Sequence, residues 1–237
     1  MAVADLFENM LEYKLTKRLK CAADAVRDGA RVADVGCDHG KLCAYLVISK
    51  KSSFTVAIDV NEQPLESARS LFAQLKIEEK TRCVLCDGLD KVCADDVDDI
   101  VMAGIGYYTI AEIVRRVPWL TQPTKRLVLV PASDHDKLRR FLYSAGYEIK
   151  RESAVCEKGQ FYTVMTAAYS GIKCTVSPHF AAFGKIHPDG DGLLYWRHEY
   201  EKAKKILKAI EQRDAKTAHE MRDIIDFAKE YCDDKPI

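Results

Sequence analysis

The sequence predicts an α/β fold in which helices cover both faces of a mostly parallel sheet. Between Gly29 and Tyr169, short apolar runs of strand length alternate with stretches of helical periodicity. Nearly continuous apolar strands that alternate with helices are typical of parallel sheets buried on both faces. The last two apolar runs are joined by the five residues Cys156–Gln160, which include a glycine and predict an antiparallel hairpin. We therefore expect a Rossmann-like sheet of about seven strands that ends in a hairpin.

The elements are expected in the following order. Apolar residues recur at helical spacing over Asp5–Arg27, and Gly29 would end that helix as a C-cap glycine. Strands are then expected at Arg31–Val35, Phe54–Ile58, Arg82–Cys86, Asp99–Ala103 and Arg126–Val130, with helices at Lys41–Ser49 and Asn61–Leu75 and hairpin strands at Tyr147–Val155 and Phe161–Ala168.

The chain changes character after Tyr169. Residues 170–192 are rich in Gly, Pro and His and show no period, whereas apolar residues return at heptad spacing from Leu193 onward. Asp214 and Thr217 interrupt this seam, so we expect two antiparallel helices that turn near 213–216. One long helix is the alternative, because neither Gly nor Pro marks the turn. We divide the chain into a sheet domain, 1–169, and a linker with a C-terminal helical or coiled-coil appendage, 170–237.

Length and composition exclude several classes of protein. The 237 residues are 48% hydrophobic and 30% charged, which rules out a disordered or collagen-like chain. No apolar run approaches the roughly 18–20 residues that span a bilayer. The segment Met1–Leu11 carries acids and lacks the apolar region of a secretory signal, so we expect a cytoplasmic protein. Lys plus Arg and Asp plus Glu both number 36, which predicts no global basic field.

The cysteines predict neither a disulfide framework nor a metal site. There are nine, an odd number, and they are scattered along the chain, which favours reduced thiols. Cys83 and Cys86 form a CxxC motif, but residues three apart in a strand face opposite sides of the sheet. No second pair completes a zinc site, so we expect no metal.

The turn after the first strand, Asp34–Gly40, is the most informative segment. Its glycines let the backbone approach a ligand closely, and Asp59, at the end of the second strand, can accept both hydroxyls of a ribose. Dinucleotides and S-adenosylmethionine share this geometry. Asp34 and Asp38 would repel a pyrophosphate, but they suit a ligand that carries a protonated amine and a sulfonium. The turn therefore favours S-adenosylmethionine.

Two further strand ends support this ligand. Asp87-Gly88 follows the third strand, where an aspartate can accept a hydrogen bond from the adenine amine. The fourth strand ends in Ala103-Gly104-Ile105-Gly106-Tyr107, a second loop of close approach. Ligands of open parallel sheets bind at the carboxyl ends of strands, so these segments converge on one site.

The same residues carry a resemblance to a known family. The matching segments are Leu15-Thr16-Lys17-Arg18-Leu19, Val32–Gly40, Val60-Asn61-Glu62, Cys86-Asp87-Gly88-Leu89, Ala103-Gly104-Ile105-Gly106 and Phe161-Tyr162-Thr163-Val164-Met165. In this order they resemble the bacterial tRNA adenine-N1 methyltransferases that modify position 22, the TrmK family. The resemblance implies a class I methyltransferase sheet, S-adenosylmethionine as cofactor with S-adenosylhomocysteine as product, and a helical tail that holds tRNA. Two positions depart from the family pattern: Tyr107 replaces a glycine, and Ala132 replaces an asparagine.

Candidate site residues follow from the strand ends and the resemblance together. The cofactor-binding candidates are Asp34, Gly36, Asp38, Gly40, Asp59, Val60, Asn61, Asp87, Gly88, Ala103 and Gly104. The candidates for positioning the acceptor are Arg18, His39, Gly104 and Tyr107. Tyr107 and Tyr108 could stack on a base. The alternatives are ordinary packing at a helix start for the tyrosines and a structural hydrogen bond for His39.

Local groups of cations are the candidate RNA contacts. They are Lys14, Lys17, Arg18, Lys20, Lys137, Arg139, Arg140, Lys202 and Lys205. The alternative is a set of solvated helix faces. Three hypotheses for function stay open: a tRNA adenine-N1 methyltransferase, which we expect to be a monomer; a protein that binds S-adenosylmethionine and RNA without turnover; and a methyltransferase for another substrate.

Overall fold

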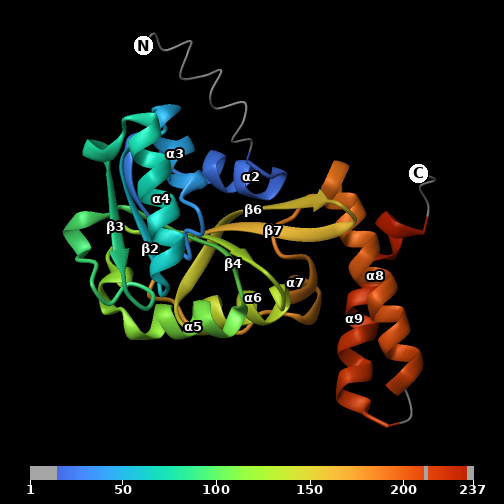
Figure 1. The fold of residues 1–237 in the computed structure, drawn as a ribbon. Helices are drawn as coiled ribbons and strands as arrows, with labels where there is room; N and C mark the ends of the chain where they lie inside the picture. Colours follow the sequence, from blue (N-terminus) through green and yellow to red (C-terminus); the bar gives the residue numbers. More distant parts are fainter. Residues whose placement is uncertain (1–14, 211–212, 234–237) are drawn as a thin grey trace.

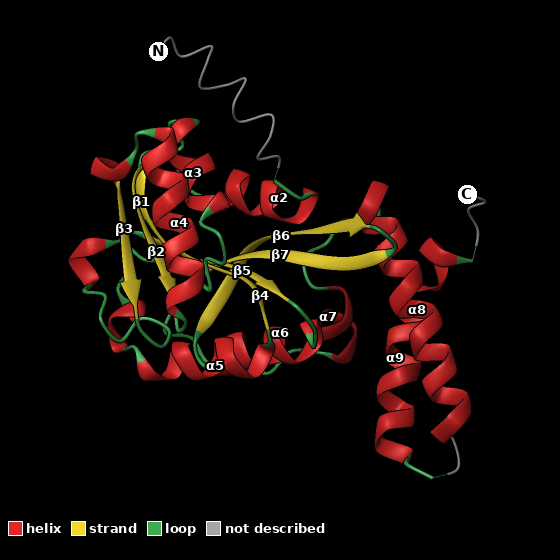
Figure 2. Cartoon of the chain, in the orientation of Figure 1, coloured by secondary structure: helices red, strands yellow, loops and turns green. Residues whose placement is uncertain are grey.

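The protein is described by a computed structural model over residues 15–210 and 213–233. The described residues form one seven-stranded sheet in the order β3-β2-β1-β4-β5-β7-β6 (Figures 1 and 2). Strands β1 to β5 pair in parallel, and β7 runs antiparallel to both β5 and β6, which confirms the predicted sheet and its terminal hairpin. The strands are β1 (Ala30–Val35), β2 (Ser52–Asp59), β3 (Thr81–Leu85), β4 (Asp99–Ile105), β5 (Arg126–Pro131), β6 (Tyr147–Glu157) and β7 (Gln160–Tyr169).

Helices cover both faces of the sheet because successive strand residues point to opposite sides. Val101 of β4 packs with Ala22 of α2, whereas the next residue, Met102, packs with Ile110 of α5 and Leu138 of α6. Helices α2, α3 and α4 lie on one face, and α5 and α6 lie on the other (Figure 1). The α-helices are α2 (Lys17–Ala25), α3 (Lys41–Ile48), α4 (Glu62–Leu75), α5 (Tyr107–Arg116), α6 (His135–Ser144), α7 (Pro178–Phe183), α8 (Gly190–Ile210) and α9 (Ala215–Cys232).

The strand order reverses between β1 and β4. From β1 the chain proceeds outward to β2 and β3, and it then crosses to β4 and β5 on the other side of β1. Ligands of open α/β sheets bind outside the carboxyl ends of the strands at such a reversal. The topology therefore places the ends of β1, β2 and β4 around one crevice.

The hairpin turn is shorter than predicted. Glu157 pairs with Gln160, so only Lys158 and Gly159 form the turn. Both have positive φ values, 50° and 76°, as expected for the two-residue turn whose twist matches that of the strands. The prediction of a five-residue loop was wrong because Cys156 and Glu157 continue the ladder of β6.

The predicted first helix is only partly within the described residues. Its part from Asp5 to Lys14 lies outside them, and α2 ends at Ala25, before the predicted Gly29 cap. Gly29 instead takes a φ of 75° and donates its N–H to the carbonyl of Lys51. It therefore belongs to the turn that leads into β1, and the prediction of a C-cap role was wrong.

The C-terminal segment forms the expected antiparallel helical hairpin, α8 and α9, which extends from the far end of the β6–β7 hairpin (Figure 1). Asp214 does not merely interrupt the seam: its side chain accepts the N–H of Thr217 and caps α9. The core of this part joins Phe183 of α7, Trp196 of α8 and Ile224 of α9 to Phe161 of the β-hairpin. Helix α7 was not predicted.

Arg139 corrects one predicted RNA contact. Its side chain is fully buried, and its Nε and Nη2 atoms donate to Oε1 of Glu152 at 2.9 and 2.8 Å. Its Nη1 atom donates to the carbonyls of Ala181 and Ala182 at the end of α7. A guanidinium in this position ties α6, β6 and α7 together and cannot reach an RNA phosphate.

Two further findings concern membrane-spanning helices and metal-ligating groups. Among the described residues, no helix is both long and apolar enough to cross a membrane. The same part of the chain contains no group of three or more metal-ligating side chains. Cys83 in β3 and Cys86, the residue after β3, pack in different core clusters.

Candidate active site

The turn after β1 is held to the end of β2 by its backbone. The N–H groups of Gly36 and Cys37 both donate to the carbonyl of Ile58, at 2.8 and 3.0 Å. Gly36, Asp38 and Gly40 all have positive φ values, so the chain doubles back before α3 begins. The side chains of Asp38 and His39 are exposed at this turn, and His39 Nε2 lies 3.4 Å from Asp38 Oδ1.

Gly40 brings the start of α3 against α4. A Cβ on Gly40 would lie 2.7 Å from Cβ of Ala68 and 2.9 Å from the ring of Phe72. Its φ of 68° is also one that side-chain-bearing residues rarely adopt. Glycine is thus needed here for packing between helices as well as for the path of the turn.

Asp34 lies beneath the turn and is the buried acid of the site. It is 3% exposed, and its Oδ2 accepts a hydrogen bond from Sγ of Cys43 at 3.6 Å. The pKa of Asp34 is raised from 3.8 to about 7, mainly by burial; the Cys43 hydrogen bond opposes this shift, and the nearby Asp38 and Asp59 carboxylates add smaller contributions to it. A cationic ligand group bound above the turn would favour the ionised form of this acid.

We expect Asp34→Asn to remove a pH dependence of stability. Because the pKa of Asp34 is raised to about 7 in the folded state, its contribution is fully present below about pH 4 and is lost as the pH rises through 7. Between pH 5 and 8 the wild type should therefore lose stability relative to the variant, on the order of 1–3 kcal/mol. Urea denaturation at the two pH values measures this. A difference between the two proteins that does not change with pH would contradict the expectation.

At the ends of β2 and β3, Asp59 is half-buried and Asp87 is exposed. Asp59 Oδ1 accepts the N–H of Asn61 at 3.0 Å, which orients the carboxylate, and Val60 is 61% exposed beside it. At the end of β3, Asp87 pairs with Nη1 of Arg116 at 3.1 Å. A Cβ on Gly88 would lie 2.8 Å from Ile113, so the chain closely approaches α5 there.

Arg18 of α2 lies over the end of β4. A Cβ on Gly104 would lie 3.3 Å from Nη1 of Arg18, and the guanidinium carbon is 5.3 Å from the centre of the Tyr162 ring. The backbone N–H of Lys17 donates to Oε1 of Glu157, which ties the start of α2 to the hairpin. The fold thus brings α2, β4 and β7 together around one guanidinium.

Tyr162 is a residue of this arrangement to which the sequence alone assigned no role. It belongs to the late-strand motif Phe161–Met165, and its hydroxyl donates to Oε1 of Gln160 at 2.6 Å. Only the packing of α2 against β7 shows that the ring lies beside Arg18.

Tyr107 is half-buried and packs against the core. Its ring lies 4.8 Å from that of Tyr108 and 6.3 Å from that of Phe141, and it packs against the core between α5 and α6. This is the packing alternative that the sequence left open. Tyr108, by contrast, is 70% exposed, with the Lys137 amine 5.7 Å from its ring centre.

The remaining cationic candidates lie on three helices: α2 on one side of the β6–β7 hairpin, α6 on the other side, and α8 at its far end (Figure 1). Lys17 and Lys20 are exposed on α2, whereas Lys137, Arg140, Lys202 and Lys205 lie on α6 and α8. Several are paired: Lys20 with Asp24, Lys137 with Asp134, Arg140 with Glu220, and Lys202 with Glu199. Lys14 lies outside the described residues.

Comparison with known proteins identifies the family of the chain. Residues 15–165 match the model of the methyltransferase domain, which is more than half of the chain. The chain belongs to this methyltransferase family. The matched region runs from α2 into β7 and so contains the turn after β1, Asp59, Asp87 and Gly104.

Relatives match almost the whole chain. The tRNA (adenine(22)-N(1))-methyltransferase of Bacillus subtilis is 28% identical over 94% of this chain and 99% of its own length. The crystal structure of the B. subtilis enzyme TrmK superposes with a TM-score of 0.75 at 26% identity, over 92% of this chain and 99% of that one. A Streptococcus pneumoniae protein in complex with S-adenosyl-L-methionine gives a TM-score of 0.77 at 27% identity, over 90% and 100%.

Proposed function

We propose that this protein is an S-adenosylmethionine-dependent RNA methyltransferase that methylates N1 of adenine at position 22 of tRNA. The observation that carries the proposal is the match to the B. subtilis m1A22 enzyme over 94% of the chain, C-terminal helices included. The carboxylates at the ends of β1, β2 and β3 support it, because they suit a cationic ligand with a ribose and an adenine.

In this proposal the crevice at the end of β1 holds the cofactor. The turn at Gly36–Gly40 lets the protein backbone approach the cofactor closely. Asp59 accepts hydrogen bonds from the ribose hydroxyls, and Val60 and Asn61 border the same edge of the crevice. Asp87, whose Oδ2 pairs with Arg116, accepts a hydrogen bond from the adenine amine. Ala103 and Gly104 are small and leave space for the cofactor at the end of β4. S-adenosylhomocysteine is the product that remains in the site after methyl transfer.

S-adenosylmethionine supplies an electrophilic methyl group on a sulfonium. The adenine N1 lone pair forms the new N–C bond as the S–C bond breaks, and the bonding pair returns to sulfur. The base takes up the positive charge, so no proton has to leave and no strong general base is needed. The task of the chain is then to position the base and exclude water, which suits Arg18 and Gly104 as positioning groups.

N1 lies on the Watson–Crick edge, so a paired adenine must be unpaired before it reacts. The cations on α2, α6 and α8 hold the RNA backbone meanwhile. Residues 1–169 form the cofactor-binding part, residues 170–237 the RNA-holding appendage, and the protein acts as a cytoplasmic monomer.

A second candidate is a protein that binds S-adenosylmethionine and tRNA without turnover. The departures at Tyr107 and Ala132 favour it, because the family resemblance assigns both positions to the acceptor side of the site. Against it, the half-buried Tyr107 ring packs against Phe141 at the edge of the core, so the larger side chain at this position has packing partners of its own. We therefore favour turnover.

The test is methylation of tRNA transcripts with adenine or guanine at position 22. With purified protein and S-adenosylmethionine, we expect up to one N1-methyladenosine per adenine-22 transcript, detected by mass spectrometry of nucleosides, and none with guanine. Binding of S-adenosylmethionine and of tRNA without product would establish the second candidate. Methylation of both transcripts would place the target elsewhere in the RNA.

A further inference from the structure

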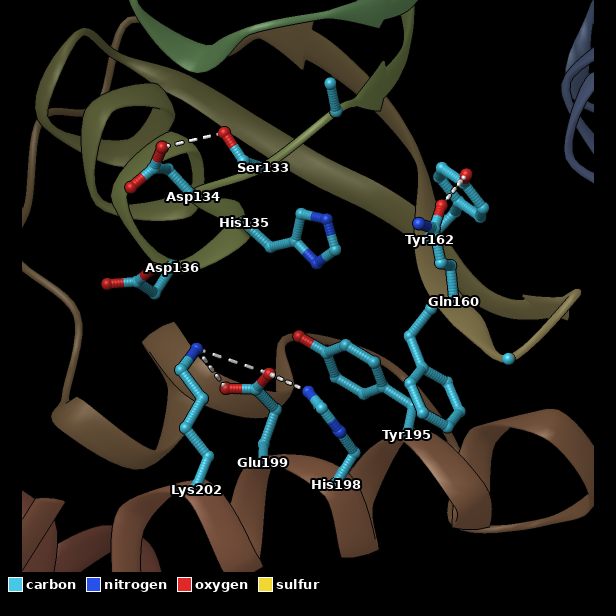
Figure 3. A pocket seen from close by; sticks show the side chains of 13 residues that line it. Ser133, Asp134, His135, Asp136, Gln160, Tyr162, Tyr195, His198, Glu199 and Lys202 are labelled. Carbon is cyan, nitrogen blue, oxygen red and sulfur yellow. Dashed lines mark hydrogen bonds and ion pairs between the residues drawn. The ribbon is translucent and has the colours of Figure 1, made fainter. Parts of the chain in front are cut away.

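A cleft of about 430 Å³ lies where the sheet domain meets the C-terminal helices. Three separate elements form its walls: the loop from β5 into α6, the turn of the β6–β7 hairpin, and α8 (Figure 3). Among the side chains that line it, His135 comes from the start of α6, Gln160 and Tyr162 come from the hairpin, and Tyr195, His198 and Glu199 come from α8. The volume is sufficient for one nucleotide.

The cleft has an aromatic interior. The His135 ring projects between the hairpin wall and the α8 wall, 6.1 Å from the ring of Tyr195 (Figure 3). Phe161 and His198 lie with ring centres 4.9 Å apart. Burial lowers the pKa of His135 to about 4, so this ring is neutral at neutral pH. Neutral flat rings suit a nucleobase, which has an aromatic face and unpaired polar edges.

The two ends of the cleft differ in chemistry. At the hairpin end, Gln160 accepts from the hydroxyl of Tyr162, which leaves its amide NH₂ free to donate to a base edge. At the α8 end, Glu199 is 15% exposed and pairs with Lys202 at 3.0 Å. A carboxylate can accept a hydrogen bond from a ribose hydroxyl, and the lysine beside it can form an ion pair with a phosphate.

The hairpin end is the one that borders the candidate site for methyl transfer. Tyr162 lines the cleft, its ring lies beside the Arg18 guanidinium, and Arg18 reaches Gly104 at the end of β4. A nucleotide in the cleft would therefore have its base toward β4 and its ribose toward α8.

We propose that this cleft binds the target nucleotide of the RNA, with the base beside Gln160 and Tyr162 and the 2′-hydroxyl of the ribose donating to Glu199. The inference rests on the proposed function, which it deepens by assigning RNA selectivity to α8. The 2′-hydroxyl is the group by which a protein distinguishes RNA from DNA at one nucleotide.

The test combines one change in the RNA with one change in the protein. Two otherwise identical tRNAs carry adenosine or 2′-deoxyadenosine at position 22, and their dissociation constants are measured with S-adenosylhomocysteine present, so that no turnover is needed. For wild-type protein we expect about tenfold weaker binding of the deoxy tRNA, the loss typical of a hydrogen bond to a charged group. Glu199→Ala should bind both tRNAs with equal affinity.

Glu201→Ala is the matched control. Glu201 lies on the same helix and forms an equivalent ion pair, to Lys204 at 2.9 Å, but it does not line the cleft. This variant should keep the tenfold difference. Gln160→Ala, at the exposed first residue of β7, should reduce the preference for adenosine over uridine at position 22 while the 2′-hydroxyl effect remains.

Retention of the full 2′-hydroxyl effect in Glu199→Ala would overturn the proposal, as would wild-type protein that binds both tRNAs equally. These results are separate from the methylation assay. If the 2′-hydroxyl effect depends on Glu199 but no N1-methyladenosine forms, the cleft binds the nucleotide and the proposed turnover is wrong. If N1-methyladenosine forms but the 2′-hydroxyl effect does not depend on Glu199, the turnover is right and the proposed role of the cleft is wrong.

Discussion

Replacement of Asp59 by alanine is expected to weaken S-adenosylmethionine binding about 100-fold and to abolish measurable methylation. Hydrogen bonds to a charged group contribute about 1.5–3 kcal/mol each, and 2.7 kcal/mol corresponds to about 100-fold in affinity. Asp59 lies at the end of β2, half-buried, with Oδ1 oriented by the N–H of Asn61. Calorimetric titration of the variant with S-adenosylmethionine measures the effect.

Asp28→Ala is the control for loss of a carboxylate. Asp28 precedes β1 at the opposite edge of the sheet and pairs with Lys51 at 2.5 Å, with a side chain that is 87% exposed. Its removal should leave cofactor affinity within twofold of wild type, because Asp28 lies away from the crevice and an exposed ion pair contributes little to the stability of the fold. An Asp59→Ala variant that binds S-adenosylmethionine as tightly as Asp28→Ala would show that the ribose lies elsewhere.

Arg139→Met is expected to have the largest effect on stability, a loss of about 3–5 kcal/mol in the free energy of unfolding. The substitution would leave Glu152 buried without a counter-charge, because both side chains are fully buried. It would also remove the donors for the carbonyls of Ala181 and Ala182, so the end of α7 should loosen first. Urea denaturation followed by circular dichroism measures the loss.

The neighbouring Arg140 provides the comparison. It pairs with Glu220 at 3.1 Å on the surface, so Arg140→Met should cost less than about 1 kcal/mol. The double variant Arg139→Met/Glu152→Leu should recover part of the loss, because no charge is then left buried alone. Equal losses for Arg139→Met and Arg140→Met would show that the buried pair does not stabilise the fold.

Apolar patterning predicted the strands to within about two residues, but it gave no bounds for helices α5, α6 and α7, and it misplaced the ends of the hairpin turn. Helix α7 has only six residues, too few to show a period, and its start depends on the capping hydroxyl of Ser177. The hairpin turn was predicted too long because Glu157 and Gln160 are polar, although they pair with each other across the ladder. Periodicity detects burial and not hydrogen-bonded pairing.

Some residues of the candidate site could likewise be predicted from the sequence, and others could not. Asp34, Asp59, Asp87 and Gly104 could be placed together because parallel strands end at one edge of a sheet. Arg139 and Arg140 are adjacent in the sequence and indistinguishable by charge, yet one is buried and the other lies at the surface. Glu199 gave no signal at all, since acids on an amphipathic helix are ordinary.

By itself, then, the sequence determined the order of strands and helices, the glycine-rich turn with its acids, and the helical appendage. These follow from local spacing, which the backbone geometry of strands and helices imposes on any chain. Only the tertiary structure decided which cation pairs with Glu152, which ring lies beside Arg18, and that α8 closes a cleft against the β5–α6 loop. Each of these depends on contacts between residues far apart in the sequence, and no local pattern encodes the partner of a charge or the far wall of a cavity.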